Sequence, residues 1–125
     1  MSKRIAAANV RLKRAYEAPV AGDGARVLVD RLWPRGVRKE DAALRMWVKD
    51  VAPSDALRRW FGHDPARWDD FRIRYRAELA SRRDAVTALR SLARQGTLTL
   101  VYGARDREHN EAVVLRNVIL GRAAD

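Results

Sequence analysis

A polar segment that follows a short apolar run contains the side chains best suited to chemistry. Residues 27–29 (VLV) are typical of a buried strand, and residues 30–36 (DRLWPRG) come directly after them. This segment supplies Asp30, Arg31, Trp33 and Arg35. Ligands in α/β sheets bind beyond the carboxyl ends of the strands, so a carboxylate and two guanidinium groups at this position indicate a site rather than core packing.

A second polar segment follows the clearest strand pattern of the chain, residues 97–103 (TLTLVYG). Tyr102 lies at the end of that strand, and the loop after it supplies Arg105, Asp106, His109 and Asn110. Guanidinium groups bind phosphate or carboxylate as a fork, and the first N–H groups of a following helix add to such a site. The two segments together therefore predict an anion site that Arg31, Arg35 and Arg105 would neutralise.

The candidate catalytic groups are Asp30 and His109, which have the chemistry of a general acid or base. The candidate ligand-binding residues are Arg31, Trp33, Arg35, His63, Tyr102, Arg105, Asp106 and Asn110. Structural roles compete with these functional ones. Asp30 could serve only to fix its loop through an arginine, Asp106 could be only a helix N-cap, and Trp33 could anchor its loop in the core.

Several kinds of chemistry have no support in the sequence. The chain has no cysteine, which excludes disulfides, thiolate catalysis and zinc fingers. Its serines are not in a nucleophile-elbow context, and no glycine-rich phosphate loop is present. The histidines lack metal-ligand spacing, so we expect neither a metal nor a cofactor. We also expect no membrane span and a cytoplasmic location.

The charge balance leaves a second function open. The net charge is +10, and 22 of the 26 cationic residues are arginine. A basic surface attracts nucleic acid, although an arginine-rich and alanine-rich composition also follows from a GC-rich genome. Arg76, Arg83, Arg90 and Arg94 would form one stripe on an unbroken helix, yet acid–arginine pairs four apart favour an ordinary solvated face.

The elements that must position these residues follow from periodicity and turn signals. We expect strands at residues 10–16, 26–32 and 97–103. We expect helices at 39–51 and 55–61, a long helical stretch from Asp64 to Gly96 with a break near 81–82, and a last helix capped by Asp106. The order predicts a single α/β domain over residues 1–125, with a mostly parallel sheet of about three strands covered by helices and residues 1–8 as a candidate flexible tail.

Several motifs of the chain resemble those of one family. The segments are LKRAYE at 12–17, RVLVDRLWPRG at 26–36, LRRWFGHDP at 57–65 and YGARD at 102–106, with His109-Asn110 after them. They are similar to the YeaO-like family of small bacterial proteins, a domain of unknown function. The resemblance covers nearly the whole chain and implies a compact α/β fold in a cytosolic bacterial protein. It implies no established activity, and the family commonly has alanine where Gly103 stands.

Three functions follow as hypotheses. The preferred one is binding of a small phosphate- or carboxylate-bearing ligand at the strand ends, with or without acid/base catalysis. The second is a nucleic-acid-binding module that uses the basic helices, with Trp33 as a stacking platform. The third is a non-catalytic interaction protein without a ligand. The sequence does not determine the oligomeric state.

Overall fold

Four short strands form an all-parallel sheet in the computed structural model, which describes residues 4–123. The strands are β1 (Val10–Arg14), β2 (Ala25–Leu28), β3 (Met46–Trp47) and β4 (Leu98–Tyr102), and they lie in the order β1-β4-β2-β3. β4 pairs with β1 over five residues and with β2 over four. The α/β class and the parallel sheet are thus confirmed, with one strand more than expected.

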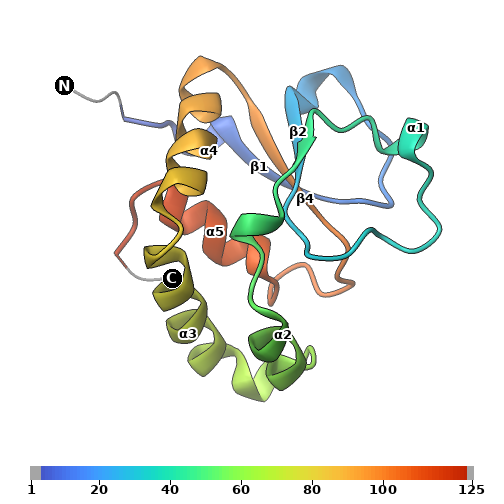
Figure 1. Ribbon diagram of the computed structural model, residues 1–125. Coiled ribbons are helices and arrows are strands. Elements are labelled where there is room, and N and C mark those ends of the chain that lie inside the picture. Colours follow the sequence, from blue (N-terminus) through green and yellow to red (C-terminus); the bar gives the residue numbers. More distant parts are fainter. Residues whose placement is uncertain (1–3, 124–125) are drawn as a thin grey trace.

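The strands contribute side chains to two separate apolar clusters, and most of the helices lie on one side of the sheet (Figure 1). Val10, Val27, Leu98 and Leu100 belong to the main core, which the helices cover. The helices are α2 (Asp55–Phe61), α3 (Trp68–Ala80), α4 (Arg83–Gln95) and α5 (Glu111–Ile119). On the other face, Leu28 and Val101 form a smaller cluster with Trp33, which follows β2, and with Trp47 of β3. The two central strands, β2 and β4, are therefore buried on both faces, as is typical of a parallel sheet, whereas the edge strands β1 and β3 each have an exposed residue, Arg11 and Met46.

Helix boundaries largely follow the turn signals. Ser54 caps α2 by accepting the Leu57 N–H at 3.1 Å, and Asp64 accepts the Ala66 N–H at 3.0 Å where the next helical segment begins. The predicted break at residues 81–82 separates α3 from α4, and Gly96 ends α4. These predictions are confirmed because each depends on a local interaction that the sequence specifies.

The prediction of a helix over residues 39–51 is wrong. The structure has a short helix, α1 (Lys39–Ala42), which ends where Ala43 adopts a left-handed conformation with φ 47°, and a separate 3-10 turn at Lys49–Val51. Met46 and Trp47 then pair with Val27 and Leu28 as strand β3. Backbone pairing at the free edge of β2 outweighs the helical spacing of Leu44 and Trp47, a tertiary contact that local periodicity does not contain.

A buried ion cluster lies where β2 begins. Asp23, which is 4% exposed, accepts hydrogen bonds from Arg26 Nη1 at 2.8 Å and from Lys13 Nζ at 3.0 Å. Burial acts to raise the pKa of Asp23, but hydrogen bonds from Lys13, the Val20 N–H and Arg26 hold it below its usual value. The next residue, Gly24, has φ 62°, and a Cβ atom there would lie 2.3 Å from the Thr97 carbonyl oxygen, so the close approach to β4 requires glycine.

Part of the candidate tail is anchored. Ile5 packs against the main core, and the Ala7 carbonyl accepts a hydrogen bond from Arg116 Nη2 at 2.9 Å. Residues 1–3 of that candidate tail lie outside the described residues. Among the helices of residues 4–123, none has the length and apolar character needed to cross a membrane.

Candidate functional site

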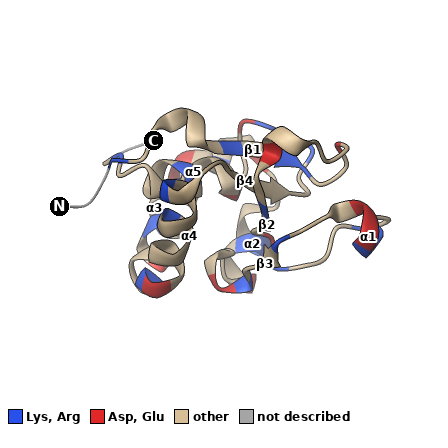
Figure 2. Ribbon diagram, turned by 90° about the horizontal axis from the view of Figure 1, so that it is seen from above, with Lys and Arg blue, Asp and Glu red and all other residues tan. Residues whose placement is uncertain are grey.

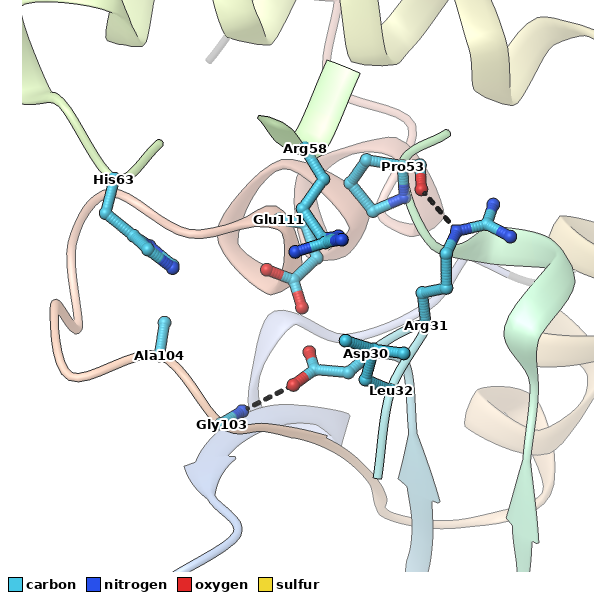
Figure 3. Close-up of a pocket in the computed structure, with 9 residues that line it drawn as sticks. All are labelled: Asp30, Arg31, Leu32, Pro53, Arg58, His63, Gly103, Ala104 and Glu111. Carbon is cyan, nitrogen blue, oxygen red and sulfur yellow. Dashed lines mark hydrogen bonds between the residues drawn. The ribbon is translucent and has the colours of Figure 1, made fainter. Parts of the chain in front are cut away.

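A pocket of about 230 Å³ opens at the carboxyl ends of β2 and β4 (Figure 3). Asp30 lies two residues after β2, and Gly103 directly follows β4. The lining residues are Asp30, Arg31, Leu32, Pro53, Arg58, His63, Gly103, Ala104 and Glu111. The pocket is therefore where the polar segments after two adjacent parallel strands were expected to meet.

The Asp30 carboxylate is fixed between the two strand ends. Its Oδ2 atom accepts the Gly103 N–H at 2.8 Å, and its backbone carbonyl accepts the Trp47 indole N–H at 2.6 Å. A Cβ atom at Gly103 would lie 3.0 Å from Asp30 Oδ2, so an alanine there would require the carboxylate to shift by a few tenths of an ångström. The Asp30 side chain is thus held by the Gly103 N–H and its backbone by the Trp47 indole, which favours a defined orientation in the pocket.

Glu111, in the first turn of α5, faces Asp30 across the pocket floor (Figure 3). Burial, the charge of Asp30 and a hydrogen bond to the Asp30 side chain raise the pKa of Glu111 well above its ordinary value of 4.5. Two carboxyl groups in hydrogen-bonding contact retain a proton between them, because both cannot ionise at low cost. A pair that shares one proton can both donate and accept a hydrogen bond.

Three basic side chains surround this carboxyl pair. Figure 3 shows Arg58 and His63 directed from the α2 side toward Glu111. Arg58 Nη2 also donates to Asp55 Oδ1 at 2.7 Å. Arg31 Nε donates to the Pro53 carbonyl at 3.1 Å, which holds its guanidinium along the wall of the pocket. Positive charge at the rim and a carboxyl pair at the floor give the pocket two ends of different chemistry.

The sequence analysis missed Glu111 and Arg58 as site residues. Glu111 has the appearance of an ordinary acidic residue in a first helical turn, where it complements the helix dipole. Arg58 has the appearance of a partner for Asp55 three residues before it. The signal that could have identified Glu111 is its position at the helix start that follows the β4 loop, at the same sheet edge as Asp30.

Two candidate residues of the segment 30–36 lie outside the pocket. Trp33 donates its indole N–H to the Val37 carbonyl at 2.7 Å and packs edge-on against Trp47, with ring centroids 5.5 Å apart. Arg35 is exposed, and its carbonyl accepts the Tyr16 hydroxyl at 2.9 Å. Neither side chain lines the pocket, since the chain turns onto the other face of the sheet after Leu32.

The segment 102–110 also contributes fewer side chains to the pocket than expected. Tyr102 is buried in the main core, and Arg105 is exposed. Asp106 and His109 form a separate pair, with His109 Nδ1 2.8 Å from Asp106 Oδ2 and the imidazole packed edge-on against Trp68 at 5.2 Å. None of these four residues lines the pocket. The segment instead supplies the backbone of Gly103 and Ala104.

The expected N-cap role of Asp106 is wrong, because Asn110 caps α5. Asn110 Oδ1 accepts the Val113 N–H at 3.2 Å, and its Nδ2 donates to the Asp106 carbonyl at 2.9 Å. Asp106 accepts the N–H groups of Glu108 and His109 in the turn before the helix, and these bonds, with the Glu108 N–H the largest effect, lower its pKa. An Asx turn and an N-cap use the same side-chain chemistry, so sequence alone did not distinguish them.

Replacing Asn110 with alanine is expected to lower the free energy of unfolding by about 1–2 kcal/mol, because an N-cap and a buried amide contact are lost together. Urea denaturation measures the change. Asn117→Ala on the same helix is the control, since the Asn117 side chain only accepts an exposed bond from Arg122. Equal losses in the two variants would contradict the capping role.

The described residues 4–123 contain no group of three or more His, Asp or Glu side chains that could hold a metal ion. The side chains that line the pocket offer two kinds of chemistry. The carboxyl pair can exchange a proton, and the rim can neutralise an anion.

Comparison with known proteins gives the family. A family model described as "Inactive DUF488-N3 subclade" matches residues 9–125. The chain belongs to this family. Uncharacterised proteins of the same kind include Rv3073c of Mycobacterium tuberculosis, 44% identical over 113 residues, which cover 90% of this chain and 95% of the relative. YeaO of Escherichia coli is 42% identical over 107 residues, which cover 86% of this chain and 93% of that protein.

The YeaO-like resemblance is thus confirmed for this DUF488-N3 protein. No solved structure matches the chain.

Proposed function

We propose that this protein binds a small anionic molecule, bearing a carboxylate or a phosphate, in the pocket at the strand ends. The observation that carries the proposal is the Asp30–Glu111 carboxyl pair at the pocket floor, opposite Arg58 and His63. The anionic group of the ligand would face Arg58 and His63. A hydrogen-bond donor on the ligand, such as an amino group, would face the carboxyl pair.

The size of the pocket limits the ligand. Sites for drug-sized molecules have volumes of about 300–1,000 Å³, whereas this pocket has about 230 Å³. A molecule the size of an amino acid fits this volume better than a nucleotide does. A compact zwitterion also matches the two ends of the pocket, because it has a positive donor on one side and an anion on the other.

We propose binding without chemical conversion of the ligand. The description of the family as inactive supports this choice. It is further supported by the contacts of His109, whose imidazole packs against Trp68 and pairs with Asp106 outside the pocket. A cytoplasmic location belongs to the same proposal and agrees with a chain that has no cysteine.

Arg58→Ala is expected to abolish binding of the ligand, because it removes a cation at the pocket rim. The experiment is a thermal-shift series with glycine, acetate, ethylammonium and inorganic phosphate as probes. At tenfold excess over its dissociation constant, a probe that binds only the folded state adds about 1.4 kcal/mol of stability. We expect glycine to stabilise the wild type most, because it satisfies both ends of the pocket.

Arg59→Ala is the matched control. Arg59 also pairs with Asp55, at 3.0 Å, but it is not among the pocket residues. Probe binding should survive in this variant and disappear in Arg58→Ala. Equal stabilisation of both variants by every probe, or no stabilisation of the wild type at all, would contradict the proposal.

A further inference from the structure

A second depression, of about 470 Å³, lies on the helical layer among α3, α4 and the end of α5. Three arginines line it: Arg76 of α3, and Arg83 and Arg90 of α4. The other lining residues are apolar except for Thr87, and no Asp or Glu is among the described residues that form it. We call this depression the arginine groove. It shares no lining residue with the pocket at the strand ends.

Two of the three arginines are held in place by backbone carbonyls at the end of α5. Arg90 donates to the Val118 carbonyl at 2.9 Å and to the Ile119 carbonyl at 3.3 Å, and Arg76 Nη2 donates to the Arg122 carbonyl at 2.9 Å. Such contacts fix the planar guanidinium groups, so less side-chain entropy is lost when an anion binds.

Arg83 differs from both neighbours. It is exposed, and its side chain makes no hydrogen bond or ion pair within the described part of the chain, 4–123. Its charge is therefore available to a partner. Arg83 and Arg90 are seven residues apart on α4, which places them on the same side of the helix about 10.5 Å apart.

The surroundings of the groove are also basic. From Arg72 to the end of α4 the chain has seven arginines and two acidic residues, Glu78 and Asp84. Glu78 is engaged by the backbone and hydroxyl of Ser54, at 2.7 and 2.5 Å. Figure 2 shows basic residues in blue along α3 and α4, with some acidic residues in red, at the end of the molecule away from α1, and in these two helices all the basic residues are arginine. The segment thus supplies half of the net charge of +10.

We propose that the arginine groove binds the phosphate backbone of nucleic acid, independently of the ligand pocket. The buried floor decides between this partner and an amphipathic peptide. Leu79 and Val86 are 3% and 4% exposed, so the groove offers little apolar surface to a peptide helix. It offers fixed and mobile guanidinium groups, which match phosphate geometry and require no particular base sequence.

The groove changes the role expected for Trp33. Trp33 belongs to the cluster on the other face of the sheet, away from the helices that form the groove. Bases of a nucleic acid bound along α3 and α4 therefore would not stack on Trp33. The binding mode is one of backbone contacts alone, with the salt dependence that such contacts bring.

Fluorescence anisotropy with a labelled DNA duplex tests the proposal at 50–200 mM salt. Three neutralised phosphates predict a slope of log affinity against log salt of about −2.7. Arg83→Glu is expected to reduce affinity about tenfold or more and to make the slope less steep by about 1. Thr87→Glu, which puts a carboxylate into the groove without removing an arginine, should weaken binding as well.

Arg38→Glu is the control, with the same change in net charge. Arg38 is exposed near α1 and only approaches Glu40 at 3.7 Å. Equal weakening by Arg38→Glu and Arg83→Glu, or no duplex binding by the wild type at 50 mM salt, would overturn the proposal. Competition with polyglutamate provides a further test. If polyglutamate displaces the labelled duplex as effectively, at equal charge, as unlabelled duplex does, the proposal is overturned, because this result would indicate an acidic protein partner.

Discussion

Replacing Asp23 with alanine is expected to lower the free energy of unfolding by about 3–5 kcal/mol. Asp23 is the one acceptor shared by Arg26 and Lys13 in the cluster at the start of β2, and both cations are largely buried there. Without the carboxylate, two desolvated positive charges remain next to each other. Urea or guanidinium denaturation of wild type and variant measures the loss.

Asp55→Ala is the control for this effect. Asp55 also accepts from two cations, Arg58 and Arg59, but its side chain is 46% exposed. Exposed pairs contribute less than about 1 kcal/mol, so the control should unfold nearly as the wild type does. A loss below about 1 kcal/mol for Asp23→Ala would show that the buried charges find other partners or water.

The wild type is expected to lose stability as the pH rises, and the Glu111→Gln variant is expected not to show this loss. The pKa of Glu111 is raised in the folded state, so the folded protein keeps a proton that the unfolded chain releases near pH 4.5. Stability therefore falls as the pH rises from about 4.5 to the folded pKa, by up to about 1.4 kcal/mol per pH unit. Glutamine keeps the neutral form at every pH.

The measurement is the difference in unfolding free energy between Glu111→Gln and wild type from pH 4 to pH 9. This difference should be small near pH 4 and grow with pH. Carboxyl groups whose pKa is lowered, such as Asp23, lose stability in acid instead, but they are common to both proteins and cancel. Glu108→Gln, at an exposed position before α5, is the control. Parallel curves of unfolding free energy against pH for wild type and Glu111→Gln would refute the shared proton.

Much of this fold could be predicted from local signals. Strand β4, helix α2 with its Ser54 cap, and the break between α3 and α4 depend on residues close together in sequence. Strand β3 could not be predicted in this way, since only two residues form it and they pair with residues about nineteen positions earlier. Its formation depends on the free edge of β2, which is a property of the assembled sheet.

Sheet topology predicted where the candidate site lies, but not all of the residues that line it. The rule that ligand sites follow parallel strands placed Asp30 and Gly103 at one edge, and the structure brings them within 2.8 Å. His63 and Arg31 also line the pocket, whereas Trp33, Arg35 and the polar side chains of residues 105–110 do not. Which side of a loop a residue faces depends on the packing of the whole loop, so residue type alone could not separate these two groups.

The position of β4 in the sheet has a consequence for synthesis of the chain on the ribosome. β4 is the last strand in sequence, yet it lies between β1 and β2 and is the only neighbour of β1. In a nascent chain that lacks β4, strand β1 therefore has no partner in the sheet. The sheet can be completed only after β4 has been synthesised, and truncation before β4 should leave an incomplete sheet rather than a smaller folded unit.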